Sequence, residues 1–152
     1  MFSFVFFLTA LMAVVLSSYS FAQKINKVNG AVGLGYTKGQ VLKALGDPAS
    51  PQKFDFFYER GEDELIVCFD DKTKLVECII VRGKSQMYSA GGIKIGDARS
   101  NVIKTYGKPE RVVDYRKSGV ECWYYPSQNV NFAISGDKVS SFGVSNVTLV
   151  KR

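Results

Sequence analysis

An internal duplication is the strongest constraint on the fold of this chain. Residues 32–48 recur as residues 93–109, in register and without a gap. Each copy contains a glycine, a helix-capping residue, an apolar pair and a closing Gly-x-Pro, and a run of aromatic and β-branched residues follows it. A motif that recurs in this way indicates two copies of one supersecondary unit.

Each copy predicts a short amphipathic helix. Thr37 and Asp97 precede the two helices, and their side-chain oxygens can accept the free amide hydrogens of a first turn. The apolar residues at i, i+1 and i+4 are Val41, Leu42 and Leu45 in the first copy and Val102, Ile103 and Tyr106 in the second. Gly46 and Gly107 predict left-handed C-caps, and a proline follows each. Helices this short are not stable alone, so another element must cover their apolar stripe.

The residues after each helix predict antiparallel strands. Alternating apolar and polar residues between turn-forming residues are typical of strands with one buried face. The predicted strands are 53–58, 64–69 and 75–81 in the first copy and 111–116, 120–125, 129–134 and 138–144 in the second. The predicted fold class is α+β: two tandem helix-plus-antiparallel-sheet repeats, with the helices packed on one sheet face. The predicted division is a signal peptide (1–22), repeat 1 (23–82), a linker (83–91) and repeat 2 (92–152).

The first residues of the chain predict export. Residues 2–15 are almost unbroken apolar sequence, and small residues up to Ala22 follow, which matches an export signal cleaved after Ala22. No Lys or Arg precedes the apolar run, so an uncleaved membrane anchor is the alternative. A spanning helix needs about 20 apolar residues, and this run is shorter. We therefore expect a periplasmic or secreted protein, which contacts a membrane only if this segment is uncleaved.

The repeated motif resembles a known family. The pattern of Gly, a capping residue, an apolar pair and Gly-x-Pro, followed by an aromatic strand such as 123–125, resembles the SmpA/OmlA (BamE-like) outer-membrane assembly lipoproteins. Two such units in one exported chain are similar to the BLIP-like fold of the β-lactamase inhibitor protein. The resemblance covers most of residues 32–144 and implies a non-catalytic binding protein with a concave sheet surface. No Cys lies near the predicted cleavage site, where the lipoproteins carry their lipid acceptor.

Charge and composition argue against several functions. The formal net charge of +6 favours acidic partners. The basic residues are spread along the chain with no run of five, which argues against nucleic acid. The chain has no His, the commonest general base and transition-metal ligand. One acidic cluster matches no calcium-loop spacing and is interpreted as solvated turns: Glu62, Asp63, Glu64, Asp70 and Asp71. We therefore expect no catalytic residue, no cofactor and no metal.

The three cysteines allow at most one internal disulfide. Cys68 and Cys78 lie on neighbouring predicted strands, and a bond between them would contribute about 3 kcal/mol. Alignment of the two copies places their side chains on opposite faces unless a bulge intervenes. Cys78 with Cys122 is the second option, and three buried reduced thiols are the third.

The aromatic residues are the candidate partner-binding site. Successive strand residues point to opposite faces, so some members of 56–57 and 123–125 must point away from the helices. Exposed Trp and Tyr commonly anchor protein contacts, and the alternative is that these rings form the core. The candidates are Phe57, Tyr58, Tyr115, Trp123 and Tyr125, with a basic rim of Arg60, Arg116 and Lys117.

The sequence thus predicts an exported, non-catalytic module that binds a protein partner. The partner is expected to be acidic, either an enzyme to be inhibited or a component of envelope assembly. The alternative is a structural envelope protein held by an uncleaved N-terminal membrane helix.

Overall fold

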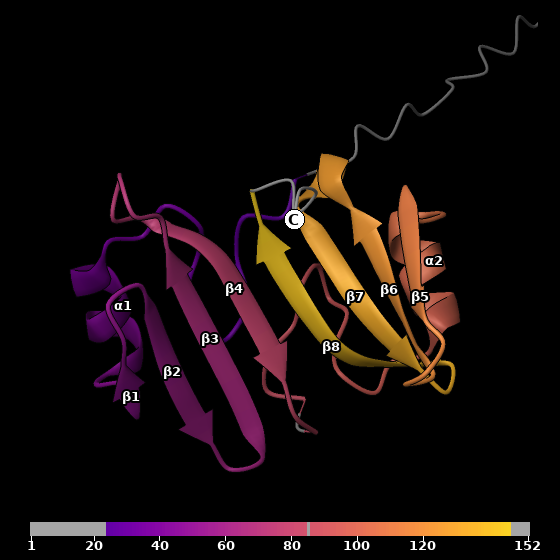
Figure 1. Cartoon of the computed structure of the whole chain (residues 1–152), viewed down its shortest axis with the longest axis horizontal. Helices are drawn as coiled ribbons and strands as arrows, with labels where there is room; N and C mark the ends of the chain where they lie inside the picture. Colours follow the sequence, from indigo (N-terminus) through magenta and orange to yellow (C-terminus); the bar gives the residue numbers. More distant parts are fainter. Residues whose placement is uncertain (1–23, 85, 147–152) are drawn as a thin grey trace, which may run out of the picture.

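The strands form one continuous antiparallel sheet. The computed structural model describes residues 24–84 and 86–146. The strands are β1 (Ser50–Pro51), β2 (Asp55–Arg60), β3 (Asp63–Phe69), β4 (Val76–Arg82), β5 (Arg111–Tyr115), β6 (Val120–Tyr125), β7 (Val130–Ser135) and β8 (Lys138–Ser145). They pair in the order β1-β2-β3-β4-β8-β7-β6-β5 (Figure 1). All except β1, which was not predicted, lie within two residues of the predicted ranges.

The predicted fold class is wrong. We expected an α+β fold of two tandem helix-plus-sheet repeats, whereas all eight strands belong to one sheet. Helices are minor: α1 (Lys38–Leu45) and α2 (Arg99–Tyr106) have eight residues each, and η1 (Pro126–Gln128) is a single 3₁₀ turn. The halves of the sheet join where β4 pairs with β8, for example Ile79 opposite Val144. The physical reason is that two separate sheets would leave the edges of β4 and β8 with unpaired backbone groups, which this pairing satisfies.

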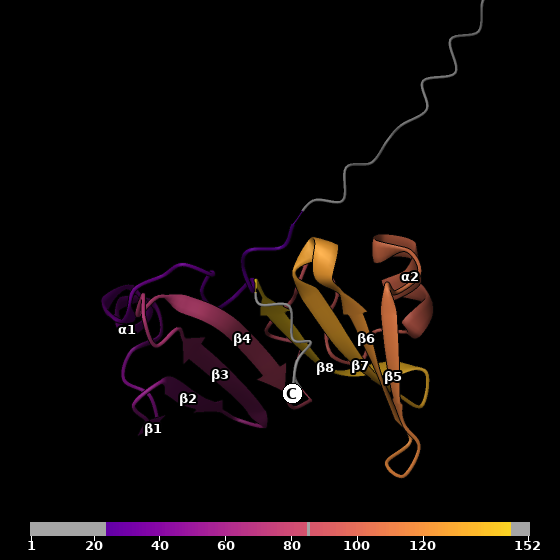
Figure 2. The ribbon, with the colours of Figure 1, turned by 45° about the horizontal axis from the view of Figure 1, so that its top comes forward.

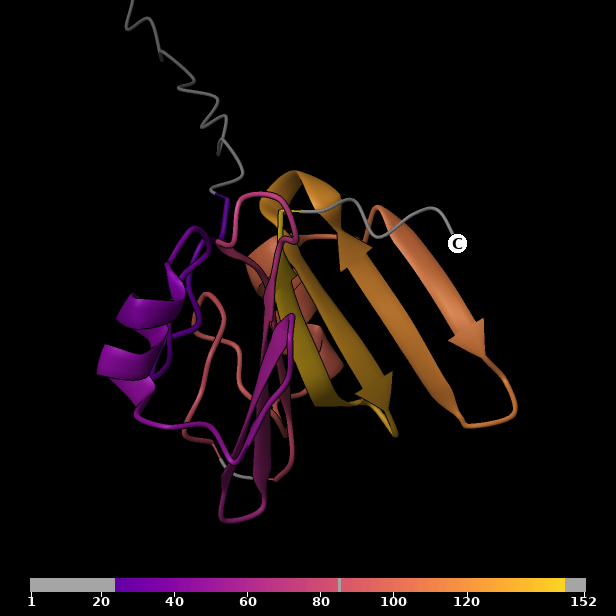
Figure 3. The same ribbon diagram turned by 60° about the vertical axis from the view of Figure 1, so that its left-hand side comes forward.

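Both helices pack on the same face of the sheet. Val41 and Leu45 of α1 and Val102 and Tyr106 of α2 are buried in one core with the inward-facing strand residues. Figure 2 shows α2 beside β5 and β6, and Figure 3 shows α1 on one side of the sheet. The segment between β4 and α2, part of which was predicted as a linker, also covers this face, with buried Tyr88, Ala90, Ile93 and Ile95.

The two helices begin differently. Thr37 caps α1 in a capping box: its hydroxyl accepts from the Gln40 amide at 3.2 Å, and its own amide donates to Gln40 Oε1 at 2.9 Å. The N-cap of α2 is Ala98, which offers no side-chain acceptor. Asp97, the predicted cap, instead accepts from the Lys94 amide at 2.9 Å.

The two helices end alike. Gly46 and Gly107 have φ of 77° and 79°, so the predicted positive φ is found. Their ψ of −163° differs from the predicted left-handed helical cap and lies in a region that only glycine adopts readily. A tyrosine hydroxyl donates to each carbonyl, from Tyr58 to Gly46 at 3.2 Å and from Tyr125 to Gly107 at 3.0 Å.

The predicted signal peptide lies outside the described residues. Within residues 24–84 and 86–146, no helix is long and apolar enough to cross a membrane.

Candidate functional site: the uncovered face of the sheet

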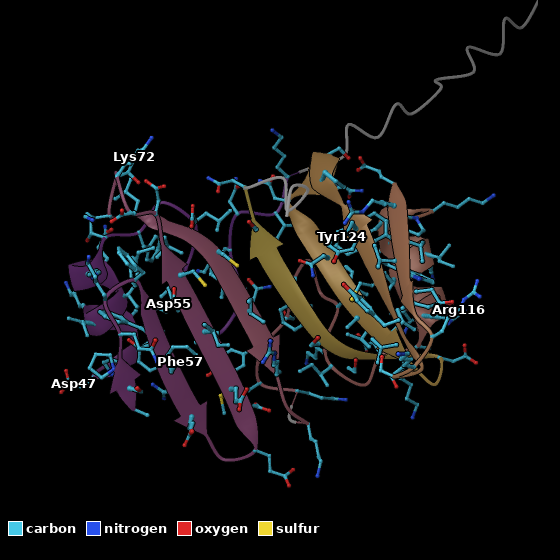
Figure 4. All side chains as sticks on the ribbon, in the orientation of Figure 1. Asp47, Asp55, Phe57, Lys72, Arg116 and Tyr124 are labelled. Carbon is cyan, nitrogen blue, oxygen red and sulfur yellow. The ribbon has the colours of Figure 1, made fainter. Side chains whose placement is uncertain are left out.

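The register of the strands separates a covered and an uncovered face. Trp123 lies opposite Phe132, and Phe132 lies opposite Phe142, all on the face that carries the helices. The alternate residues form the uncovered face. They include Asp55, Phe57, Ile66, Cys68, Cys78, Ile80, Ser141, Gly143, Ser145, Asn131, Ala133, Cys122, Tyr124, Arg111, Val113 and Tyr115. Figure 4 looks onto this face and labels Asp55, Phe57 and Tyr124 on it.

The uncovered face is curved at its β5 end. In Figure 3, β5 and β6 swing outward on the side opposite α1. No described segment of the chain lies over this face, since the helices and the segment after β4 pack on the other one. Most of its apolar residues are only partly buried, as expected for the open side of a sheet.

Three predicted partner-binding residues belong to the core instead. Tyr58, Trp123 and Tyr125 are 3%, 5% and 0% exposed. The Tyr125 ring packs against Tyr106 of α2 at 5.4 Å and against Phe132 at 6.2 Å, between ring centroids. The prediction that these three rings meet a partner is therefore corrected: they point toward the helices.

Two predicted aromatic residues do lie on the uncovered face. Phe57 on β2 is half-buried, and Tyr115 at the end of β5 is 51% exposed. They lie in the two outer parts of the sheet, because β2 and β5 are separated by five strands in the pairing order.

The predicted basic rim does not form around one surface. The Arg60 guanidinium donates to the Leu45 carbonyl at 2.6 Å and so holds the end of α1. Arg116 and Lys117 are exposed in the turn after β5, where Arg116 pairs with Asp114 at 3.5 Å. Arg60 ends β2 and Arg116 follows β5, so they belong to opposite halves of the sheet. Figure 4 labels Arg116 near β5.

The sequence interpretation missed a stacked Tyr and Arg pair. Tyr124 on β6 lies opposite Arg111 on β5, and the guanidinium carbon is 4.5 Å from the ring centroid. Burial raises the pKa of Tyr124, with smaller contributions from Cys122 and Tyr115, while a hydrogen bond to Arg111 opposes the rise. The signal was the alternation within 123–125, where Tyr124 must face away from its two neighbours.

Two cysteines form a cross-strand pair on the same face. Cys68 on β3 lies directly opposite Cys78 on β4, and the register shifts between Cys68 and Phe69. The sequence allowed the two side chains to share a face only if a bulge intervenes, and this bulge places both on the same face. Cys122 lies on β6, which β7 and β8 separate from β4, so the arrangement excludes the pairing of Cys78 with Cys122. All three cysteines are free in this structure.

The acidic residues do not assemble into a metal site. Asp70 accepts the Thr73 amide at 2.6 Å, and Asp71 pairs with Lys74 at 2.8 Å, while Asp63 is buried beside the β2–β3 turn. Hydrogen bonds from Thr73 lower the pKa of Asp70. Among the residues that the structure describes, no group of three or more His, Cys, Asp or Glu side chains could hold a metal ion.

Comparisons with known proteins match the fold only. No family model and no curated protein matches the chain. A DUF4309 family protein (YjgB) from Bacillus subtilis subsp. subtilis str. 168 has a TM-score of 0.50 and 18% identity over 72% of this chain and 77% of that chain. A cysteine-rich secretory protein from Staphylococcus aureus subsp. aureus Mu50 has a TM-score of 0.55 and 13% identity over 82% of this chain and 48% of that chain. An extracellular protein containing a SCP domain, from Bacillus anthracis str. Ames, has a TM-score of 0.51 and 10% identity over 74% of this chain and 44% of that chain.

These similarities show that the fold is shared and do not indicate an activity. The chain spans less than half of the length of the second and third proteins. None of the three descriptions names a catalytic activity, and none names the SmpA/OmlA or BLIP-like families. The resemblance to those families stays a prediction.

Proposed function

We propose that this chain is an exported, non-catalytic protein that docks an acidic protein partner at the β5–β6 end of its uncovered sheet face. The observation that carries this proposal is a preassembled surface of Arg111, Val113, Tyr115, Cys122 and Tyr124, which we name the Tyr124 patch. It belongs to the curved end of the sheet, and no described segment covers it.

The side chains of the Tyr124 patch suit a protein contact. Tyr and Arg are enriched among residues that contribute most to binding. Because Arg111 already stacks on Tyr124, both side chains lose less conformational entropy on binding than free side chains would. Val113 and the exposed Tyr115 add apolar surface beside them.

The Arg111 guanidinium on this surface favours an acidic partner. A guanidinium prefers a carboxylate, which it can bind through two parallel hydrogen bonds. The net charge of +6 would also accelerate encounter with such a partner.

Export and the absence of catalysis rest on separate observations. The apolar segment 2–15 has the pattern of an export signal, and two proteins of similar fold are described as secretory or extracellular. Lack of His, together with the dispersed acidic residues, argues against acid–base or metal chemistry. A mature N-terminus at Gln23 in culture or periplasmic fluid supports export, whereas an intact chain in the membrane fraction would contradict it.

Site-specific photocrosslinking tests the docking surface. A photoreactive phenylalanine derivative is placed at Tyr115 on the uncovered face or at Leu42 on the exposed side of α1, in the exported protein in its host. We expect one saturable protein adduct from position 115 and none from position 42. Equal adducts from both positions, or none from position 115, would contradict the proposal.

Affinity measurements with the captured partner complete the test. Tyr124→Ala should weaken binding about 30-fold, the effect of a central aromatic contact of about 2 kcal/mol. Arg111→Lys should also weaken it, because an ammonium cannot form the paired hydrogen bonds. Ile103→Ala, on the exposed side of α2, is the matched control and should bind as the wild type. Unchanged binding by folded Tyr124→Ala would eliminate this surface.

A further inference from the structure

We propose that Cys68 and Cys78 are joined by a disulfide in the exported protein and that Cys122 remains a free thiol. The bond would staple β3 to β4 on the uncovered face. It is independent of docking at the Tyr124 patch, since the pair lies in the other half of the sheet.

The register places Cys68 and Cys78 directly opposite each other on neighbouring strands. The Ser145 amide donates to Asn129, toward β7, so the polar groups of Ser145 point away from β4. Cys78, opposite Ser145, therefore directs its own amide and carbonyl toward β3 and makes a hydrogen-bonded pair with Cys68. Cα atoms of such a pair are about 5.5 Å apart, which is within the range of disulfides. Its Cβ atoms are also about 5.5 Å apart and must approach each other to about 4 Å as the bond forms.

The two thiols already interact. A hydrogen bond with Cys78 raises the pKa of the Cys68 thiol, and burial and nearby Asp55 raise it further. The hydrogen bond from Cys68 lowers the pKa of Cys78, against the effects of burial, Glu77 and Asp55. The two sulfur atoms are thus within hydrogen-bond reach of each other, and each is placed to react with the other.

The surroundings of the pair indicate a structural bond rather than a catalytic dithiol. Cys78 is only 9% exposed, and its charged neighbours Asp55 and Glu77 are acidic. Redox-active cysteines instead lie near cationic groups and are accessible. A shielded bond is attacked slowly by external thiols, so it should persist once formed.

The oxidant is a disulfide of a small thiol or of a thiol–disulfide oxidoreductase. One thiolate of the pair attacks one sulfur of that disulfide and expels the first thiolate. The other cysteine then attacks the resulting mixed disulfide, forms the intramolecular bond and expels the second thiolate. Two electrons pass to the oxidant, and the two protons released by the cysteines reprotonate the two expelled thiolates.

Oxidation of the full chain by glutathione disulfide tests the proposal. We expect the free thiols of the denatured protein to fall from three to one, with the loss of two hydrogen atoms in mass and a peptide that links Cys68 to Cys78. The melting temperature should rise by about 5–10 °C and return on reduction. Three surviving thiols, a bond to Cys122, a stable glutathione adduct or a disulfide dimer would each overturn it.

Matched serine variants keep the result interpretable. Cys122→Ser should lose two thiols on oxidation and show the same rise in melting temperature as the wild type. Cys68→Ser and Cys78→Ser should each show neither change. If oxidation stabilises either of these two variants as much as the wild type, a different cross-link is responsible and the proposal fails.

Discussion

At the scale of single residues, burial of tyrosine rings has a measurable consequence. Tyr125 is fully buried, and its hydroxyl donates to the carbonyl that ends α2. Burial raises the pKa of Tyr125 to about 12. Burial, followed by the neighbouring Tyr125, raises the pKa of Tyr106 to about 12 as well.

These two tyrosines should destabilise the fold at alkaline pH. In the unfolded chain they ionise near pH 10, whereas in the folded chain they keep their protons up to about pH 12. The folded state then binds more protons, so the stability present below pH 10 is lost as the pH rises through that range. Tyr125→Phe should reduce the decrease in the free energy of unfolding by at most about 1.4 kcal/mol per pH unit. Urea unfolding over this pH range measures the free energy of unfolding.

An exposed residue without an ionisable group provides the control for this measurement. Leu42→Ala on the exposed side of α1 should leave the alkaline slope unchanged. If Tyr125→Phe and wild type lose stability with the same slope, Tyr125 does not resist ionisation in the folded state.

At the scale of elements, the two helices differ at their first residue. Thr37 gives α1 a side-chain acceptor, whereas Ala98 gives α2 none. Ala98→Ser should therefore stabilise the protein by about 1 kcal/mol, and Thr37→Ala should destabilise it by a similar amount. Thermal or urea unfolding of both variants measures this. A destabilising Ala98→Ser would show that the first turn of α2 cannot accommodate a capping side chain.

The helices and strands were predictable because their signals are local. Capping residues, glycines followed by prolines, and alternating strand residues are read within a few positions of each other. Thr37, Gly46 and the bounds of β6 were predicted in this way. Ala98 was missed because Asp97, the better capping residue, is used by a neighbouring turn.

The site was only partly predictable because it depends on pairing between distant strands. Alternation shows that the side chain of Tyr124 points to the opposite face of the sheet from Trp123 and Tyr125. It does not show which of the two faces carries the helices. The Cys68 and Cys78 pair depends on one bulge, which moves the register by one residue and reverses the face. No local pattern marks such a bulge.

At the scale of the whole molecule, the pairing of β4 with β8 makes one structure out of two similar halves. Val81 lies opposite Phe142 and Ile79 opposite Val144 across this junction, and all four side chains are buried in the shared core. The sequence predicted two separate repeats because a duplication identifies the repeated supersecondary unit. It does not show that strands of the two copies pair with each other. The continuous core implies that neither half retains its full set of contacts without the other.

Unfolding should therefore be a single transition across the entire sheet. Fluorescence of Trp123 reports the second half of the sheet, and alkylation of buried Cys78 in a Cys68→Ser, Cys122→Ser background reports the first. We expect both probes to give the same urea midpoint in that background. Phe142→Ala at the junction should lower both midpoints together, by about 3–5 kcal/mol in stability, whereas Val112→Ala on the exposed edge strand should change them little. If Phe142→Ala separated the two midpoints, each half would fold alone and the β4–β8 pairing would join two independent units.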